Sequence, residues 1–286
     1  MPGLSRLLLS PPSCRDVEAL RRAVRGRTVL LTGASFGIGE ATARLFGQAG
    51  AEVILVARTR EKLREVERDI RAGGGRAHVY PLDLSRPADV APLMQEVQRL
   101  HPRIDVVVSN AGKSIRRPAL RSLERRDLER LLAVNCTGPA ALILALLPRM
   151  IGQGGGQIVS VSTVSAKAPA APRWASYQGS KAGFDLWLRG LAAEVRGQGV
   201  RVSSVYMPLV RTRMSAASGL YRRAPALTPR EAAEVIAGAV VRPRDRVAPW
   251  WLGGQELAAL LLPGVLDGVL GRLEDRERRR EGGTPA

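Results

Sequence analysis

The stretch Val29-Leu30-Leu31-Thr32-Gly33-Ala34-Ser35-Phe36-Gly37-Ile38-Gly39 decides the fold. Its apolar start is typical of a buried strand, and residues 40–49 have helical spacing before Gly50 provides a stop signal. A glycine-rich turn between strand and helix presents backbone N–H groups and the positive end of a helix dipole to a pyrophosphate. The spacing G-x-x-x-G-x-G therefore predicts a dinucleotide-binding loop, with cofactor contacts from Gly33, Ser35, Phe36, Gly37, Ile38 and Gly39.

Apolar runs alternate with helical patterns along the rest of the chain. Strands are expected at residues 28–32, 52–57, 77–81, 104–108, 157–162 and 201–206. This alternation is the order of an α/β fold with a parallel, doubly wound (Rossmann-type) sheet. With 286 residues, of which 45% are hydrophobic, the chain can form one such domain. We expect an N-terminal extension over 1–25, the Rossmann-type domain over 26–250, and an apolar helical extension with a charged end over 251–286.

The second decisive motif is Tyr177-Gln178-Gly179-Ser180-Lys181, inside a segment from Trp174 to Glu194 that predicts one long helix. Four residues of separation place Tyr177 and Lys181 on one face, a turn apart. An unperturbed tyrosine has a pKa of about 10, and lowering it by two units with a nearby ammonium corresponds to roughly 2.7 kcal/mol. By itself such a pair is better explained as part of a helix surface. Downstream of a dinucleotide loop, it predicts a tyrosine that exchanges a proton with a carbonyl or an alcohol.

These motifs stand in the order typical of the short-chain dehydrogenase/reductase family, and residues 26–250 resemble its branch with TGxxxGxG and YxxxK motifs. The resemblance implies hydride transfer with a nicotinamide cofactor, Tyr177 as the acid, and Lys181 lowering its pKa and holding the nicotinamide ribose. It also implies adenine contacts at Asp83 and Leu84, and a cofactor-binding motif at Asn110, Ala111 and Gly112. Asn135 matches the asparagine that holds a water in the proton relay behind the lysine.

The chain departs from the family pattern near its catalytic serine. In Val161-Ser162-Thr163 the residue in that place is Thr163, which we assign as the hydroxyl that orients the carbonyl, with Ser162 as the alternative. A threonine hydroxyl donates the same hydrogen bond, although its methyl group stiffens the rotamer. The segment from Thr163 to Tyr177 is one residue longer than in the family pattern, so Ser165 or a shifted loop could interfere with this assignment of the hydroxyl. Gln178 stands where a small residue is usual.

A further departure lies in Met207-Pro208-Leu209-Val210-Arg211-Thr212, which resembles the family's P-G-x-V-x-T segment. Pro208 occupies the glycine position, so this backbone must tolerate a fixed φ and a missing donor. We assign Val210 and Thr212 to the nicotinamide carboxamide on the same resemblance.

The end of the second predicted strand indicates which cofactor is bound. Folds that prefer NAD place an acid there for the ribose 2′-hydroxyl, whereas an arginine accommodates a 2′-phosphate. Here Ala57 is followed by Arg58. Arg58 could be one more arginine in an arginine-rich chain, but the missing acid favours NADP(H) independently.

The net charge of +18 and a pI near 11.4 would normally suggest a nucleic-acid partner. No nucleic-acid motif is present and aromatic residues make up only 4%, so we rank a solvated basic surface first and an anionic substrate or membrane surface second. Cys14, Cys136, His78 and His101 are isolated in the sequence, and we expect no metal. The apolar stretch within residues 1–10 is too short for a secretory signal, which favours a cytoplasmic protein.

Substrate information lies after residue 206. The expected lid spans residues 214–229 and carries Leu220, Tyr221, Arg222 and Arg223. In combination with residues 207–212 and with Arg246-Val247-Ala248-Pro249, it resembles a bacterial subgroup associated with reduction of fatty acyl-CoA and long-chain aldehydes. We therefore expect reduction of a small lipophilic carbonyl substrate by a homo-oligomer. A hydroxysteroid or 3-oxoacyl reductase is the runner-up, and a non-catalytic NADP(H) sensor is the alternative of another class.

The apolar segment from Trp250 to Leu273 is interrupted by Pro263, Gly264 and Asp267, and it has no run of the about 20 apolar residues that span a bilayer. It could cap the pocket, pair subunits, make peripheral membrane contact or simply pack on its own domain. Residues 275–281 are expected as a solvated, frayed end.

Overall fold

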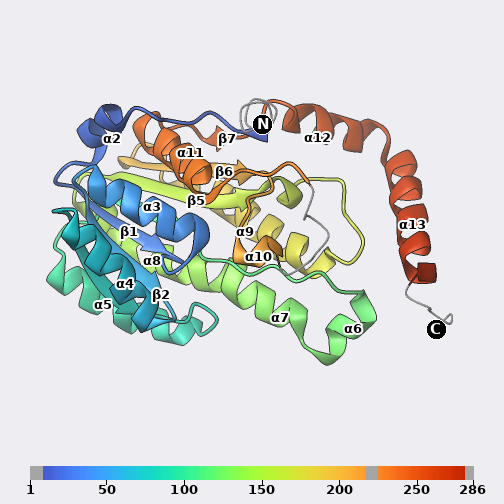
Figure 1. The fold of residues 1–286 in the computed structure, drawn as a ribbon, viewed down its shortest axis with the longest axis horizontal. Helices are drawn as coiled ribbons and strands as arrows, with labels where there is room; N and C mark the ends of the chain where they lie inside the picture. Colours follow the sequence, from blue (N-terminus) through green and yellow to red (C-terminus); the bar gives the residue numbers. More distant parts are fainter. Residues whose placement is uncertain (1–8, 217–223, 281–286) are drawn as a thin grey trace.

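Seven parallel strands form one sheet in the order β3-β2-β1-β4-β5-β6-β7, in a computed structural model that describes residues 9–216 and 224–280 (Figure 1). The strands are β1 (Thr28–Thr32), β2 (Glu52–Ala57), β3 (Arg76–Pro81), β4 (Val106–Ser109), β5 (Gly156–Thr163), β6 (Val200–Met207) and β7 (Arg246–Val247). The order reverses between β1 and β4, which confirms the doubly wound fold. The two-residue strand β7 was not predicted, because so short a segment carries no periodic pattern.

Helices cover both faces of the sheet, which explains why its strands read as continuous apolar runs. Buried side chains of α2 (Val17–Val24), α3 (Gly37–Gln48), α4 (Arg60–Ala72) and α11 (Pro229–Val241) form one core with the sheet. Those of α5 (Val90–Leu100), α8 (Gly138–Gly152) and α9 (Ala175–Glu194) form the other. Successive strand residues alternate between them, so that Leu30 packs on the second face while Val29 and Leu31 pack on the first.

Shorter elements connect this frame to its loops. They are the 3-10 turns η1 (Pro87–Asp89) and η3 (Val164–Ala166), the π-helical turn η2 (Ala133–Thr137), and the helices α6 (Ala119–Glu124), α7 (Asp127–Leu132) and α10 (Arg213–Ala216). One continuous helical stretch, Asp127–Gly152, is long and apolar enough by composition to cross a membrane. Its α8 part places Leu142, Ile143 and Leu146 in the core, which gives the apolar character an ordinary packing explanation.

The segment before residue 26 contributes to the core instead of standing apart from it. The Asp16 carboxylate caps α2 by accepting from the backbone N–H groups of Glu18 and Ala19. Leu20 and Val24 are fully buried against the first face. The expected extension 1–25 therefore includes, in its described part, one helix of the α/β domain.

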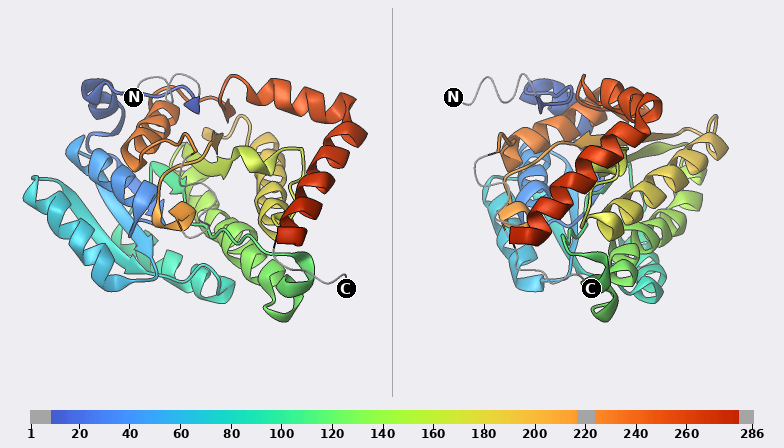
Figure 2. Two further views of the ribbon diagram at one scale, coloured as in Figure 1. Left: turned by 45° about the vertical axis from the view of Figure 1, so that its right-hand side comes forward. Right: turned by 90° about the vertical axis from the view of Figure 1, so that its right-hand side faces the viewer.

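The C-terminal segment forms two helices, α12 (Leu252–Leu261) and α13 (Pro263–Arg280), which meet at Pro263. From the β7 edge, α12 leads outward and α13 turns along the side of the molecule toward α6 (Figure 2). Within the described part of the tail, α13 has no buried side chain, and in α12 only Leu252 is buried. The helix continues to Arg280, so the expectation of a frayed end is wrong for residues 275–280, and Glu277 is ion-paired.

Candidate active site

The glycine-rich loop lies at the carboxyl end of β1 and needs its glycines for physical reasons. Gly33 and Gly37 have φ values of +70° and +58°, in the left-handed region that favours glycine. A Cβ on Gly39 would lie 2.1 Å from the carbonyl oxygen of Gly33, so helix α3 can approach the strand this closely only without a side chain. Phe36 precedes α3 and its side chain does not cap the helix, which leaves first-turn N–H groups facing the loop. This arrangement fits a pyrophosphate.

Asn110 and Ala111, at the carboxyl end of β4, fasten this loop to the sheet. Both backbone N–H groups donate to the hydroxyl of Thr32 at 3.0 Å, and Asn110 Nδ2 donates to the Thr32 carbonyl at 3.0 Å. A Cβ on Gly33 would lie 2.8 Å from Asn110 Nδ2. The two residues are therefore held against the loop by the pairing of β1 with β4, which no local pattern reveals.

Lys181, Asn135 and Gly112 converge although 69 residues of chain separate Gly112 from Lys181. A Cβ on Gly112 would lie 3.2 Å from both Lys181 Nζ and Asn135 Oδ1, so both groups lie close against this glycine and a side chain here would crowd them. Lys181 is buried, and its ammonium donates to the Val161 carbonyl at 3.2 Å. Burial lowers the pKa of Lys181 to about 8.

The fully buried side chain of Asn135 braces the site. Its Oδ1 accepts from Lys113 N at 2.8 Å, and its Nδ2 donates to Lys113 O at 2.9 Å and to Ser180 Oγ at 3.0 Å. Both amide protons are thus used, whereas Oδ1 keeps one of its two lone pairs. Ser180 Oγ in turn donates to the carbonyl of Tyr177 at 2.8 Å, so hydrogen bonds connect the first turn of α9, which carries the tyrosine, to the Asn135 side chain.

Ser162 and Thr163 differ in what their hydroxyls contact. Ser162 Oγ is shielded from solvent and has no hydrogen-bond partner among the described residues. Thr163 is half-buried, and its Oγ1 accepts from Ser165 N at 3.2 Å, which caps η3. An oxygen that accepts this bond still has its own proton to donate.

Arg58 and Asp83 line one open pocket of about 640 Å³ at the carboxyl ends of β2 and β3, together with Leu82 and Arg86. Burial raises the pKa of Asp83, but hydrogen bonds from the Ser85 N–H and hydroxyl outweigh it and keep that pKa below its usual value. Leu84 is buried in the core instead, so its side chain faces away from this pocket.

The segment after β6 lies across the glycine loop. A Cβ on Gly37 would lie 3.2 Å from the methyl carbon of Thr212, and the guanidinium of Arg213 lies 4.4 Å from the centre of the Phe36 ring. Val210 is buried and bridges to Leu227. Leu220, Tyr221, Arg222 and Arg223 of the expected lid lie outside the described residues.

Comparisons with known proteins agree with this geometry. The family model described as short chain dehydrogenase matches residues 27–221. The chain belongs to this short-chain dehydrogenase family. It is 42% identical over 236 residues to a fatty acyl-CoA reductase of Acinetobacter baylyi, a match that covers 82% of this chain and 80% of the relative.

Two further proteins are similar to this chain in sequence or structure. A fatty acyl-CoA reductase of Mycobacterium tuberculosis is 39% identical over 250 residues, covering 87% of this chain and 83% of the relative. A metagenomic short-chain oxidoreductase solved in complex with NADP has 34% identity and a TM-score of 0.69, covering 79% of this chain and 97% of the other. These matches confirm the predicted family and fold and its oxidoreductase class.

The departure at Gln178 from the short-chain dehydrogenase pattern has a structural reason. Its Nε2 donates to the Ser165 carbonyl at 2.9 Å and its Oε1 accepts from Ala171 N at 2.7 Å. The long side chain thereby holds the loop between β5 and α9, the segment that is one residue longer than the pattern. The two departures from the family pattern are therefore linked in the structure, because the first supports the second, a relation that the sequence does not reveal.

A second feature that the sequence did not reveal is a set of ion pairs between α13 and the site's loops. Arg173, buried and in the left-handed region at φ 65°, pairs with Glu274 at 2.8 Å and with Glu277 at 3.2 Å. Arg116 also pairs with Glu277. Arg173 lies just before α9, four residues from Tyr177, and Arg116 lies four residues after Gly112, so these pairs hold the C-terminal helix beside the candidate active site.

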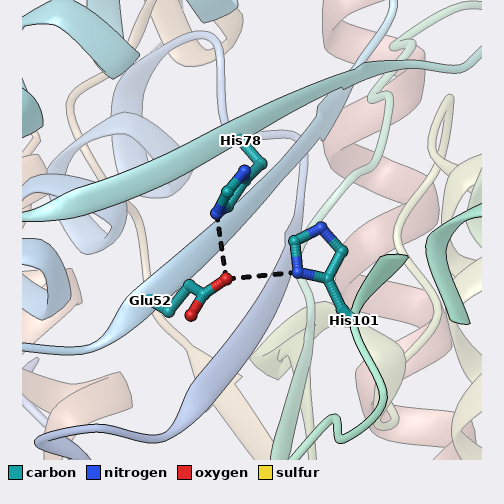
Figure 3. Close-up of side chains that lie close together, drawn as sticks. All are labelled: Glu52, His78 and His101. Carbon is teal, nitrogen blue, oxygen red and sulfur yellow. Dashed lines mark hydrogen bonds and ion pairs between the residues drawn. The ribbon is translucent and has the colours of Figure 1, made fainter. Parts of the chain in front are cut away.

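The expectation that the histidines are isolated is wrong. His78 and His101 both contact Glu52 Oε1, at 2.9 Å and 3.2 Å (Figure 3). Their separation in sequence hid this contact, because the pairing of β2 with β3 and the end of α5 create it. The cluster lies at the amino ends of the strands, opposite the candidate active site.

Proposed function

We propose that this chain is an NADPH-dependent reductase of a lipophilic carbonyl compound, a fatty aldehyde or fatty acyl-CoA, with Tyr177 as the proton donor. The observation that carries the proposal is the convergence of the buried Lys181 ammonium and Asn135 at Gly112. A purely sensing protein would not require this brace. The fatty acyl-CoA reductases among the relatives support the substrate class.

The residues around the loop fit NADPH, which supplies a hydride when bound. The loop of Gly33, Gly37 and Gly39 would hold the pyrophosphate at the start of α3. Arg58 is exposed at the pocket that Asp83 also lines, where a guanidinium can form charge-assisted hydrogen bonds with a 2′-phosphate. Thr212 would face the nicotinamide end, because it lies over Gly37.

The chain's own residues then move one proton. Tyr177 donates its hydroxyl proton to the carbonyl oxygen, and the nearby ammonium of Lys181 stabilises the phenolate that remains. The free lone pair of Asn135 Oδ1 lies on the same side of Gly112 as Lys181 Nζ, where it can hold a relay water. Thr163 is the preferred partner of the carbonyl, since this residue is half-buried and its hydroxyl keeps a proton to donate, whereas Ser162 Oγ is shielded from solvent.

The position of helix α13 and the exposed apolar side chains of the tail favour a lipophilic substrate. The ion pairs of Arg173 and Arg116 with Glu277 hold α13 beside the site. The large exposed apolar side chains of the tail are Trp250, Leu257, Leu260, Leu261, Leu262, Val265, Val269 and Leu273. So many exposed apolar side chains mark an interaction surface instead of ordinary packing. In this proposal they form one wall of the channel for the acyl chain. The same side chains would also make peripheral contact between a cytoplasmic enzyme and the lipid that holds the substrate.

The test measures NADPH oxidation with fatty aldehydes and acyl-CoAs of increasing chain length. Each buried methylene contributes about 0.8 kcal/mol, so kcat/KM should rise about fourfold per methylene until the channel is full. Glu274→Gln combined with Glu277→Gln should flatten this rise, because both ion pairs of Arg173 are lost. The double variant Asp267→Asn and Asp275→Asn, which removes the same number of charges at exposed positions of α13, is the matched control.

Two results would contradict the proposal. Higher activity with short ketones or steroids than with long aldehydes and acyl-CoAs would favour the runner-up substrates. NADPH binding without oxidation of NADPH by any carbonyl compound would favour a sensor. Flotation with phosphatidylglycerol and phosphatidylcholine vesicles tests the lipid contact. Equal flotation of the full chain and of a truncation after Pro249 would show that the tail does not contribute to lipid binding.

A further inference from the structure

The chain contains only two histidines, and both contact the same carboxylate oxygen. Glu52 begins β2, His78 lies in β3, and His101 follows the end of α5. Figure 3 shows the two rings converging on Glu52 from different segments. Imidazole nitrogen together with carboxylate oxygen is the donor set that zinc accepts in proteins.

The spacing of the three ligand atoms suits one metal ion. Metal–ligand bonds of about 2.0–2.2 Å in a tetrahedron place neighbouring ligand atoms about 3.3–3.5 Å apart. Glu52 Oε1 lies 2.9 Å from His78 Nε2 and 3.2 Å from His101 Nδ1, and all three atoms lie within 4.8 Å of one another. The two distances from Glu52 Oε1 therefore need to lengthen by only a few tenths of an ångström. The two nitrogens, which lie at most 4.8 Å apart, need to approach each other by at most about 1.4 Å.

The surroundings hold the ligands in place. His101 is 5% exposed, and its other nitrogen, Nε2, lies 2.9 Å from the hydroxyl of Tyr80. Such a partner fixes the ring orientation of a metal-binding histidine. The second oxygen of Glu52 faces Arg76 at 3.6 Å, which leaves Oε1 as the oxygen for a metal. The His78 side chain is 37% exposed, so an ion and a water ligand can reach the cluster from solvent.

We propose that Glu52 Oε1, His78 Nε2 and His101 Nδ1 bind a divalent metal ion of the zinc type, with water in the fourth position. Each coordinating nitrogen uses its lone pair, so each ring carries its proton on the other nitrogen, and His101 Nε2–H donates to the Tyr80 oxygen. Glu52 and Arg58 are six residues apart, which in an extended strand is about 20 Å. The ion thus joins β2, β3 and the α5 loop far from the cofactor loop, and the inference does not depend on the proposed function.

Calorimetric titration of the untagged, chelator-treated full chain with zinc chloride tests the site. We expect one ion per chain. His78→Gln and Glu52→Gln should each weaken binding at least tenfold, and Tyr80→Phe about tenfold, because loss of the partner that orients a ligand has this effect. Cys14→Ala and Cys136→Ala, which remove the two free thiols of the described residues, should leave the affinity unchanged.

Thermal unfolding supplies a second readout. Zinc at a hundredfold excess over Kd should raise the Tm of the wild type by about 5 °C and leave that of His78→Gln unchanged. Unaltered NADPH affinity shows that the His78→Gln variant is folded. Absence of zinc uptake, or equal uptake by wild type and a folded His78→Gln, would overturn the proposal, and so would a cobalt(II) spectrum with a thiolate charge-transfer band that is lost in Cys136→Ala.

Discussion

Replacing Lys181 with methionine should abolish turnover and yet stabilise the cofactor-free protein. Burial lowers the pKa of this lysine from 10.5 to about 8, and at neutral pH a shift of this size means that the buried charge costs about 3 kcal/mol. Methionine removes the charge but also the donor to the Val161 carbonyl, a loss of about 1 kcal/mol. The net gain of about 2 kcal/mol corresponds to about 4 °C in Tm for a chain of this size.

The gain should depend on pH in a defined direction. Because the folded-state pKa of Lys181 is lower than 10.5, the unfolded chain binds more protons between about pH 8 and 10.5, and the stability contributed by this residue rises across that window. Below pH 8 the ammonium is charged in both states and its cost is fully present. The stability difference between Lys181→Met and wild type should therefore be largest below pH 8 and shrink toward pH 10.5.

Thermal unfolding without NADPH measures the effect, and Lys167→Met is the control. Lys167 is also largely buried, but its Nζ pairs with the buried Asp185 carboxylate at 2.7 Å. Burial lowers the pKa of Lys167, and the interaction with Asp185 outweighs that effect, so the pKa is raised. Lys167→Met removes the partner of the buried Asp185 carboxylate and should destabilise the fold by about 3–5 kcal/mol. A folded Lys181→Met variant with a lower Tm than wild type at pH 7 would refute the reasoning.

Three further outcomes concern the site itself. Tyr177→Phe should abolish NADPH oxidation while fluorescence titration shows unchanged NADPH affinity, because the proton source is removed and the glycine loop is not; appreciable turnover would exclude Tyr177 as the acid. Arg58→Ala should weaken NADPH binding by about 2 kcal/mol and leave NADH binding nearly unchanged, since only NADPH carries the 2′-phosphate; equal losses for both would reject this role. Thr163→Ala should lower kcat more than Ser162→Ala does, because Thr163 is half-buried whereas Ser162 Oγ is shielded from solvent; the opposite ranking would move the assignment to Ser162.

Sequence patterns anticipated the features that depend on near neighbours. The strands β1 and β2 were predicted at their observed bounds. Bounds elsewhere differ by one or two residues, as for β4, expected at 104–108 and found at Val106–Ser109. Such differences arise because hydrogen bonds to neighbouring strands, not the apolar run itself, decide where a strand begins and ends.

What the sequence by itself determined is local: the left-handed turns that require Gly33 and Gly37, and the one-turn spacing of Tyr177 and Lys181 on α9. A backbone repeat sets such relations within a few residues. Only the tertiary structure decided that Lys181 is buried beside Asn135, that Glu274 and Glu277 of α13 pair with Arg173, and that the two histidines share Glu52. These contacts join residues far apart in the chain, so strand order, register and helix packing create them, and no pattern of near neighbours contains that information.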